Sequence, residues 1–281
     1  MDLFKIKNLM CAYQEKGKRK PVLYIPELTI ERGKLVFVLG VSGIGKSTLI
    51  ETLGLMNNTI ANPEACEIDF IHQNEHQTEL SKLWSVSNNE ISAFRNEHFS
   101  FVFQQNNLMP NFTAGENASV SQLIRGNTLN DVKERVLEVM RAINLKEELY
   151  YRKIAELSGG ERQRLCFIRA VTASYDVLFG DEPTGNLDAI TAGKLMDFAQ
   201  KQLGNKSAIV VSHDISLALK FADNILIMVR SDFEGNNVGQ ILQENILTKN
   251  KDKNWINNLN EKVENPYQLI YSILERETIL V

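Results

Sequence analysis

The chain has 281 residues and a formal net charge of −4, enough for one large or two small domains with a sizeable core. A slightly acidic chain is a poor electrostatic match for nucleic acid, so no nucleic-acid partner is expected. Three widely spaced cysteines without a CxxC pair predict neither a disulfide framework nor a zinc site. Charges interrupt the first ten residues, and no apolar stretch reaches the roughly 20 residues of a membrane helix. Any membrane span is therefore expected in another chain.

The first forty residues are predicted to contain three strands. Residues 1–10 alternate loosely in polarity, and residues 22–30 form a second run after the basic segment 16–20. A turn at 31–33 leads into the apolar run 34–39, which is typical of a buried parallel strand. A solvated turn is the simplest interpretation of the basic segment, and steering of phosphate groups is the alternative.

The sequence GVSGIGKST at residues 40–48 follows this third strand and precedes an expected helix. It matches the pattern G-x-x-x-x-G-K-[ST] of phosphate-binding loops. Glycines let the backbone turn tightly and bring its N–H groups to an anion, and the helix start adds donors and a positive dipole end. Lys46 supplies a mobile charge for the β- and γ-phosphates, and the Ser47 hydroxyl can ligate Mg²⁺. The candidate phosphate-binding residues are Gly40, Ser42, Gly43, Gly45, Lys46, Ser47 and Thr48.

Residues 55–98 are polar and the hardest part to assign, with a weak strand signal at 67–72. His72 and His76 stand four apart, a spacing that would put both on one face of a helix. The order HQNEH differs from the HExxH of zinc proteases, and no third ligand is evident. A polar surface segment is the preferred interpretation.

A predicted helical block follows. A short apolar strand leads to Gln104 and Gln105, and residues 113–116 have the spacing of a helix capping box. Apolar residues between 132 and 143 recur at helical spacing. The region of about 105–157 is therefore predicted to be a helical subdomain inserted between α/β parts.

From residue 157 the chain alternates helices and strands. The segment LSGGERQ begins a helix, one apolar strand ends in Asp181 and Glu182, and another ends at His213. This alternation favours a mostly parallel sheet with right-handed connections and helices on both faces. Such sheets bind ligands at the carboxyl ends of their strands. Gln104, Asp181, Glu182 and His213 are therefore predicted to converge on the phosphate loop.

The paired carboxylates suit nucleotide hydrolysis. Asp181, held at a strand end, can bind Mg²⁺ directly or through water. Glu182 can accept a proton from an attacking water molecule. The alternative is that the pair only caps the following turn. An isolated histidine such as His213 is usually structural, so its residue type alone leaves its role open.

The segments GVSGIGKST, FQQ, LSGGERQR, LFGDEPTGNLD and VSHD, in this order, resemble the ATP-binding subunits of ABC transporters over about residues 3–230. LSGGE is nearly diagnostic of that family. ERQR and DEPTGNLD are most similar to the subgroup that serves lipoprotein-release, macrolide-export and cell-division membrane partners. The resemblance implies a P-loop NTPase core with a mostly parallel sheet, an N-terminal antiparallel β subdomain and an inserted α-helical subdomain. It implies an ATPase domain over residues 1–245, with its core at 1–104 and 158–245, and a C-terminal extension over 246–281.

The resemblance also assigns roles to single residues. Gln104 would sense the γ-phosphate and Mg²⁺, with the adjacent Gln105 as second choice, and His213 would contact the γ-phosphate. Tyr13 would stack on adenine, or else it is a packing tyrosine at a strand end. The implied catalytic residues are Glu182 and His213, and the implied metal ligands are Ser47, Gln104 and Asp181. A second phosphate-binding surface is implied at Ser158, Gly159 and Gly160, with Asp188 at the same interface.

In this family the second surface serves the ATP held by a partner subunit, so two copies are expected to pair head to tail as a homodimer around two ATP molecules. The implied function is ATP hydrolysis that powers export or extraction of a lipid-linked or peptide cargo through a separate membrane-spanning permease. The chain is then expected in the cytoplasm, peripheral on the inner face of the cell membrane. One alternative is an ATP-driven mechanical regulator of a membrane partner without transport. Another is a soluble ABC ATPase acting on nucleic acid or ribosomes, which the single motif set and the lack of sustained heptads disfavour.

Several positions depart from the family pattern. Gly180 replaces a larger apolar residue or alanine before the carboxylate pair, which is expected to loosen packing there. Ala114 and Gly115 stand where many relatives carry a bulkier residue before Glu-Asn. None of these departures removes a chemical group needed for hydrolysis.

The resemblance ends beyond about residue 245. Asn265 and Pro266 have the pattern of a helix start, and a helix is predicted over 266–276. Its apolar stripe comprises Leu269, Ile270, Ile273 and Leu274. The stripe either packs on its own domain or docks to a dimer mate or membrane partner.

Overall fold

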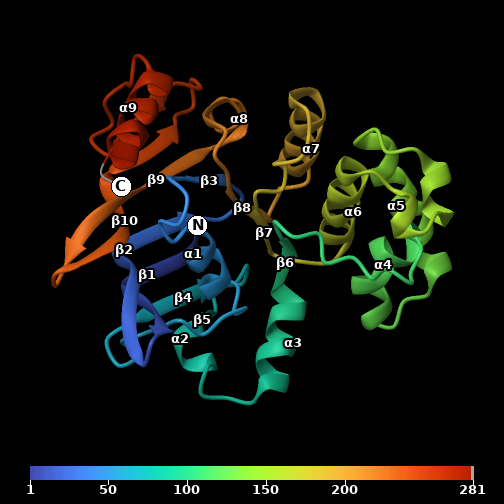
Figure 1. Cartoon of the computed structure of the whole chain (residues 1–281), viewed down its shortest axis with the longest axis horizontal. Helices are drawn as coiled ribbons and strands as arrows, with labels where there is room; N and C mark the ends of the chain where they lie inside the picture. The colour runs from blue at the N-terminus through green and yellow to red at the C-terminus, as the bar shows by residue number, and fades with distance from the viewer. Residues whose placement is uncertain (280–281) are drawn as a thin grey trace. The chain divides into compact units, whose positions relative to one another are not determined.

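The structure, a computed structural model, describes residues 1–279 (Figure 1). Its contacts divide the chain into two compact units. The first comprises Met1–Arg95 together with the chain from Val211 onward, and the second comprises Asn96–Val210. The second unit is thus inserted in the sequence of the first.

The sheet of the first unit runs in the order β5-β4-β1-β2-β10-β9-β3, with β11 paired to β10. Its N-terminal part is antiparallel, because β1 pairs antiparallel with both β2 and β4, whereas β3 and β9 run parallel. The strands are β1 (Asp2–Glu15), β2 (Lys18–Glu31), β3 (Leu35–Leu39), β4 (Glu67–Ile71), β5 (Gln77–Glu79), β9 (Asn224–Phe233), β10 (Asn236–Lys249) and β11 (Trp255–Ile256). The helices of this unit are α1 (Lys46–Leu53), α2 (Leu80–Leu83), α8 (Ile215–Phe221) and α9 (Pro266–Ile279), and α3 (Asn88–His98) spans the boundary between the units.

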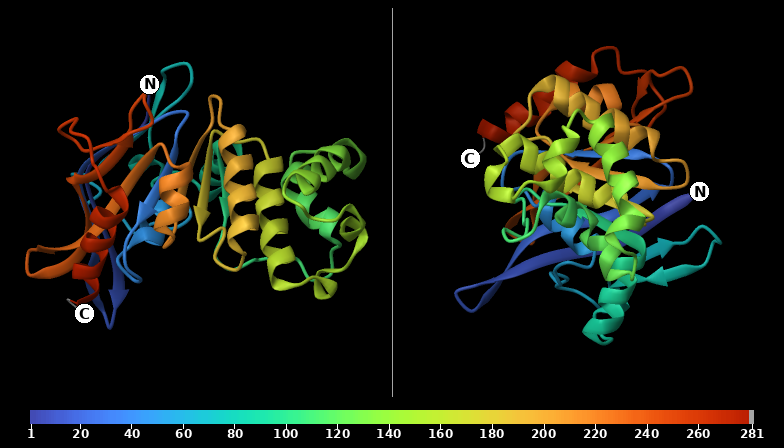
Figure 2. Two further views of the ribbon diagram at one scale, coloured as in Figure 1. Left: turned by 90° about the horizontal axis from the view of Figure 1, so that it is seen from above. Right: turned by 90° about the vertical axis from the view of Figure 1, so that its right-hand side faces the viewer.

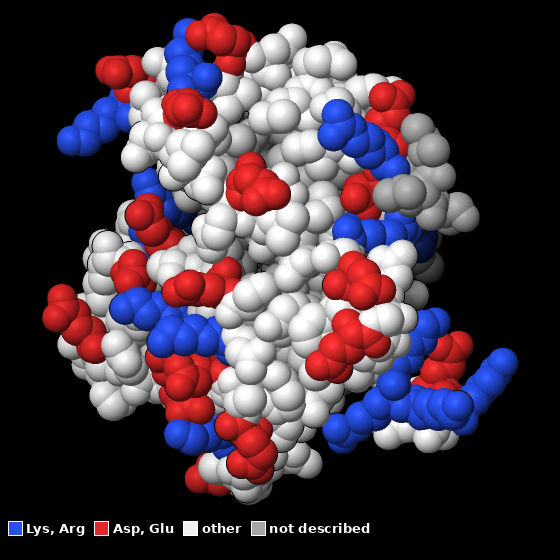
Figure 3. Space-filling model, turned by 90° about the vertical axis from the view of Figure 1, so that its left-hand side faces the viewer, with Lys and Arg blue, Asp and Glu red and all other residues white. Residues whose placement is uncertain are grey.

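The basic segment 16–20, interpreted from the sequence as a solvated turn, mostly belongs to strand β2. Only Lys16 and Gly17 turn between β1 and β2, and both have positive φ angles, of 50° and 79°. This is the backbone twist that a two-residue hairpin turn requires. Lys20 pairs with Glu15 across the hairpin at 2.9 Å, so part of the positive charge is balanced locally. On the face drawn in Figure 3, acidic and basic side chains are interspersed.

The second unit combines the strands β6, β7 and β8 with a helical bundle (Figures 1 and 2). Helices α4, α5 and α6 contact one another, and β6 pairs parallel with β7. The elements are β6 (Phe99–Val102), α4 (Ala114–Ile124), α5 (Leu129–Ala142), the 3-10 helices at Glu147–Tyr151 and Ile154–Glu156, α6 (Gly159–Thr172), β7 (Val177–Asp181), α7 (Ala189–Lys201) and β8 (Ser207–Val211).

Local capping fixes where the helices of the second unit begin. The capping box predicted at residues 113–116 is confirmed: Thr113 Oγ1 accepts from the N–H of Glu116, and the carboxylate of Glu116 accepts from the N–H of Thr113. The same reciprocal arrangement starts α6, between Ser158 and Glu161. Each box satisfies two helix-end donors that would otherwise need water.

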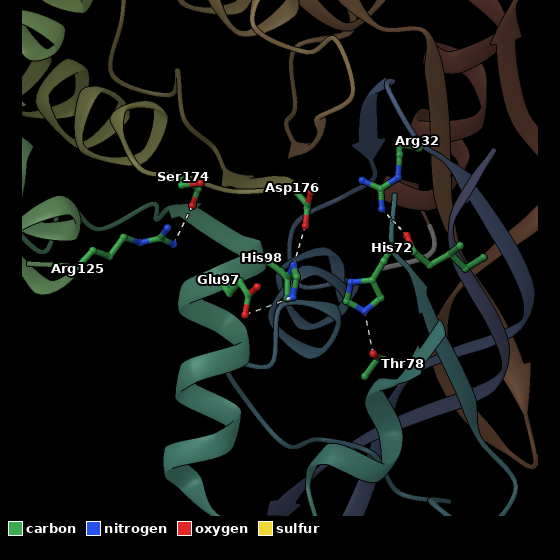
Figure 4. Close-up of polar contacts among 9 residues, drawn as sticks. Arg32, His72, Thr78, Glu97, His98, Arg125, Ser174 and Asp176 are labelled. Carbon is green, nitrogen blue, oxygen red and sulfur yellow. Dashed lines mark hydrogen bonds and ion pairs between the residues drawn. The ribbon is translucent and has the colours of Figure 1, made fainter. Parts of the chain in front are cut away.

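One polar pair sets the start of β6 and β7 relative to each other (Figure 4). His98 Nδ1 lies 2.6 Å from Asp176 Oδ2, and the N–H of Asp176 donates to the carbonyl of His98 at 2.8 Å. Phe99 then stands opposite Val177 in the parallel pair. This side-chain and main-chain clamp fixes the register of β7, whose far end carries Asp181.

The segment 55–98, which the sequence left mostly unassigned, contains two strands and two helices. His72 and His76 do not share a helix face. They flank the turn between β4 and β5, where the N–H of His72 donates to the carbonyl of His76 at 2.8 Å. His72 Nε2 also lies 2.8 Å from Thr78 Oγ1 (Figure 4). Within residues 1–279 no group of three or more His, Cys, Asp or Glu side chains is arranged to hold a metal ion.

The C-terminal helix differs from its predicted stripe. Ile270 is fully buried and Glu277 is 7% exposed, whereas Leu269 is 37% exposed. Ile273 and Leu274 are half-buried, so the packed face runs along positions 270, 273, 274 and 277, at the i, i+3, i+4, i+7 spacing of a helix, and it ends in a carboxylate. Helix α9 packs this face on α8 and β9.

Gly115 has a packing role that its sequence context concealed. A Cβ atom at this position would clash with ring atoms of Tyr150, whose side chain is buried. The ring thus occupies the space above the first turn of α4. Gly115 is required by this contact and not by a special backbone conformation.

We therefore expect Gly115→Ala to destabilise the protein by about 1–3 kcal/mol, because an over-packed ring must move. Replacing glycine with alanine elsewhere in a helix normally stabilises a protein. A decrease in the free energy of unfolding would therefore point to the clash. The measurement is the urea-unfolding midpoint. In a Tyr150→Leu background the same change should cost much less, and equal costs in both backgrounds would exclude the Tyr150 clash as the cause.

Candidate functional site

The phosphate loop leaves the buried strand β3 and enters helix α1. Gly43 and Gly45 have φ angles of +74° and +106°, conformations that side-chain-bearing residues rarely adopt. A Cβ at Gly45 would also lie 3.2 Å from the carbonyl oxygen of Val22, and one at Gly40 would lie 3.0 Å from that of Met228. The glycines are therefore set by backbone geometry and by close approach of β2 and β9.

Lys46 closes the loop on itself. Its side chain is buried, and its ammonium donates to the carbonyl oxygens of Gly40 and Val41, at 2.8 Å each. Helix α1 begins at Lys46, and its N-cap residue, Gly45, has no side chain to occupy the helix N-terminus. Backbone N–H groups, a positive helix end and an ammonium group converge here, which is the arrangement that binds phosphate.

Two more predicted site residues lie in the same unit as the loop. The Tyr13 hydroxyl lies 3.2 Å from Thr48 Oγ1, and the residue is 38% exposed. This contact brings an accessible aromatic ring next to α1, and its stacking on adenine stays a prediction. The N–H of Ser212 donates to the carbonyl of Val38 in β3 at 3.2 Å, so His213 follows directly after a residue fixed beside the strand that feeds the loop.

The carboxylate pair belongs to the second unit. Asp181 ends β7, and Glu182 has a φ of +47°, an unusual conformation for a residue with a side chain. The carbonyl of Glu182 accepts from Gln163 Nε2 at 3.1 Å, and Asn186 Nδ2 donates to Gln163 Oε1 at 3.1 Å. These bonds hold the Glu182 backbone in a strained turn of the kind found at functional sites.

Gly180 does not leave a void before this pair. A Cβ there would lie 3.1 Å from Cγ of Pro183. The proline ring thus fills the space that a larger residue would take, and the expectation that Gly180 loosens packing is wrong.

The signature segment presents two glycines at the start of α6. A Cβ atom added at Gly159 would meet no other atom within 4 Å, and one at Gly160 would contact only Leu187, Asn186 and Arg164 at 3.5 Å or more. Packing within the chain therefore does not require glycine at either position. The Glu161 carboxylate accepts from the N–H of Ser158 at 2.8 Å, and this bond lowers the pKa of Glu161. Glu161 is thus an anion that occupies one donor of this helix end.

Asp188 caps helix α7. Its carboxylate accepts from the N–H groups of Ile190 and Thr191, at 3.1 and 3.0 Å, and from the Thr191 hydroxyl at 2.7 Å. The bonds from Thr191, followed by that from Ile190, lower the pKa of Asp188. Gln104 and Gln105 are both exposed after β6, so both remain candidates for the glutamine role.

The first unit brings together the phosphate loop, Tyr13 and His213, and the second contains Gln104, Asp181, Glu182, Asp188 and the signature residues 158–160. The convergence of the two sets on one nucleotide remains a prediction. Sequence reasoning missed Arg230, Leu274 and Thr278, which line a cavity of about 620 Å³ with residues 40–42 and His213. No motif marks these three residues, because they meet the loop only through tertiary packing. No described helix is both long and apolar enough to cross a membrane.

Comparison with known proteins agrees with these features. The family model for ABC transporters matches residues 24–185. The "Lipoprotein-releasing system ATP-binding protein LolD" of Myxococcus xanthus is 37% identical over 221 residues, which cover 78% of this chain and 92% of that protein. Its namesake from Alcanivorax borkumensis is 34% identical over 217 residues, covering 76% and 89%.

Solved structures show the same relationship. The dimeric structure of MJ0796, described as a bacterial ABC transporter cassette, superimposes with a TM-score of 0.72 at 26% identity, covering 88% of this chain and 98% of that one. A post-hydrolysis dimer of MJ0796 with ADP and Pi gives a TM-score of 0.71 at 27% identity, covering 85% and 96%.

The chain therefore belongs to the ABC transporter family, as one of its ATP-binding ATPase subunits. The predicted P-loop NTPase fold class and the resemblance to the lipoprotein-release subgroup are confirmed.

The loop geometry allows a matched test of the phosphate site. Gly43 and Gly17 have nearly equal φ angles, +74° and +79°, and both have open space where a Cβ would be. Alanine at either position should therefore cost a similar amount of stability, about 1–2 kcal/mol. We expect only Gly43→Ala to weaken binding of a fluorescent ATP analogue. Equal binding by both variants would argue against a ligand at the loop.

Proposed function

We propose that the chain is the ATPase subunit of a lipoprotein-releasing system, which hydrolyses ATP to power extraction of a lipid-linked cargo through a separate membrane-spanning permease. The observation that carries the proposal is 37% identity to a lipoprotein-releasing ATP-binding protein across 92% of that protein's length. As part of this proposal, the chain is cytoplasmic and peripheral on the inner face of the cell membrane.

The residue roles are part of the proposal. The phosphate loop binds the β- and γ-phosphates, with Lys46 as their counter-charge, and His213 contacts the γ-phosphate. Glu182 acts as the general base that accepts a proton from the attacking water. Gln163 donates to the backbone carbonyl of Glu182, and Asn186 in turn holds the Gln163 side chain, which supports a fixed orientation for this residue.

Mg²⁺ is the proposed metal. The groups assigned to it are the hydroxyl of Ser47, the amide oxygen of Gln104 and the carboxylate of Asp181, all hard oxygen donors of the kind this ion prefers. When bound, it supplies charge neutralisation at the β- and γ-phosphates. The protein's own part is to orient these oxygens and to hold the phosphates.

We propose a head-to-tail homodimer as the working form. MJ0796, with a TM-score of 0.72 to this chain, was solved as a dimer. The two signature glycines, which no contact within the chain requires, suit close approach of a phosphate held by a second copy. Nucleotide would then bind two subunits at once and favour the closed pair.

We expect Glu182→Gln to bind ATP and dimerise while hydrolysing it about 10²–10⁴ times more slowly, the usual cost of losing a positioned base. Phosphate release from the purified protein is the measurement. Glu138→Gln, on the exposed face of α5, is the matched control and should turn over normally. Wild-type turnover in the Glu182 variant would remove this residue from the role of base.

Lys46→Ala should abolish both ATP binding and ATP-dependent dimerisation, because the loop would lose its buried ammonium. Light scattering with and without ATP reports the dimer, and Lys34→Ala, outside the loop, is the control. Full hydrolysis by a dilute monomer would contradict the shared-site interpretation.

The cargo and partner are tested in membranes. Purification of the tagged chain from native membranes should yield a permease, and ATP added to vesicles containing both should release a lipid-modified protein. A partner that responds to ATP without releasing any lipid-modified protein would favour the mechanical-regulator alternative.

A further inference from the structure

Helix α9 lies outside the part of the chain that the family model matches, residues 24–185. The N–H of Gln268 donates to Asn265 Oδ1 at 3.0 Å, so Asn265 caps the helix. The helix buries Ile270 completely, and it contacts α8 and β9. It is therefore a docked element of the first unit, with a defined start and a defined buried face.

The last turn of α9 is anchored to Arg230 in β9. The N–H of Arg230 donates to Glu277 Oε2 at 2.7 Å, and Arg230 Nη1 donates to the main-chain oxygen of Glu277 at 2.6 Å. A carboxylate that is only 7% exposed needs such donors, because burial of an uncompensated charge is costly. The guanidinium also complements the negative end of the helix dipole. These two bonds fix both the position and the rotation of α9.

The anchored turn faces the phosphate loop across a cavity of about 620 Å³. Residues 40–42 and His213 line one part of it, and Leu274 and Thr278 of α9 line another, with Arg230 also in the lining. The carbonyl groups of two of these loop residues hold the Lys46 ammonium. A phosphate held by Lys46 would therefore lie at the edge of a space that α9 bounds.

We propose that α9 is a wall of the nucleotide site, and that Glu277 and Arg230 are positioning residues that hold this wall against the triphosphate end of a bound nucleoside triphosphate. Leu274 then limits access of water from this side, and Thr278 marks the end of the wall. Because the docked helix adds contacts to the bound nucleotide, it strengthens ATP binding, and ATP strengthens the docking of α9 by the same factor, since such coupling is reciprocal. The inference rests on the proposed ATP site and adds a part of the chain that the family motifs do not include.

The wall is tested by protection of an introduced thiol. The three native cysteines are buried, and burial raises the pKa of the Cys66 thiol to about 12 and that of Cys166 to about 11. They should therefore react slowly at neutral pH. Thr278→Cys puts a reactive thiol on the cavity lining, and Glu275→Cys puts one on an exposed position of the same helical turn that does not line the cavity.

We expect saturating ATP to slow modification of the Thr278→Cys thiol about five-fold or more, and to leave the Glu275→Cys thiol unaffected. The rates are measured at a dilution where light scattering shows a monomer, so that a second copy cannot cause the protection. Equal rates with and without ATP at position 278 would overturn the proposal, provided that a fluorescent ATP analogue binds the same protein. Failure of the analogue to bind the wild-type chain would instead overturn the proposed function.

The positioning role is tested at the anchor. Glu277→Ala removes the acceptor of the Arg230 N–H, and we expect the Kd for ATP to rise about five-fold. Glu277→Gln retains an oxygen acceptor in the same place and should bind within about two-fold of the wild-type chain. Glu275→Ala is the control on the exposed side. An unchanged Kd in Glu277→Ala would contradict the role, and so would a loss that Glu277→Gln does not restore.

Discussion

The backbone of the phosphate loop is the constraint on which the rest of the first unit depends. Two glycines in left-handed conformations turn the chain between β3 and α1, and Lys46 ties the turn to its own carbonyl groups. The close approach of Val22 and Met228 shows that β2 and β9 are packed to this turn with no room for side chains at residues 45 and 40. Sheet order and loop shape therefore support each other, since a bulkier loop would displace both strands.

In the second unit, the position of the carboxylate pair is fixed by contacts at both ends of strand β7. The pair lies at the end of this strand, whose start is clamped by His98 and Asp176 and whose exit is a strained turn at Glu182. The ring of Pro183 packs against Gly180 after this strand and fills the space that a larger side chain at residue 180 would take. Rigid placement matters for a proposed base, because misplacement of a reacting group by about 1 Å can cost a hundred-fold in rate.

Several carboxylates near helix ends are stabilised by hydrogen-bond donors close to them. Glu161 and Asp188 serve as anions at helix starts, where backbone N–H groups lower their pKa values. Glu277 is instead an anion near the C-terminal end of a helix, where the helix dipole disfavours negative charge. It is tolerated there because Arg230 supplies donors to both its carboxylate and its carbonyl group. That unusual placement gives the C-terminal helix a single docked orientation beside the phosphate loop.

Features controlled by short-range physics could be predicted from the residues alone. The phosphate loop, the capping boxes at Thr113 and Ser158, and the alternation that predicts a P-loop NTPase fold depend on neighbouring residues, because turns and caps are set by local backbone geometry. Other features became visible only in the folded chain. The strand β5 and the helices α2 and α3 within residues 55–98, the clash that requires Gly115, the burial of Glu277 and the contact of α9 with the loop cavity all depend on packing between distant parts of the chain. Their side chains acquire these roles only when packing brings their partners within reach, and no local pattern encodes that distance.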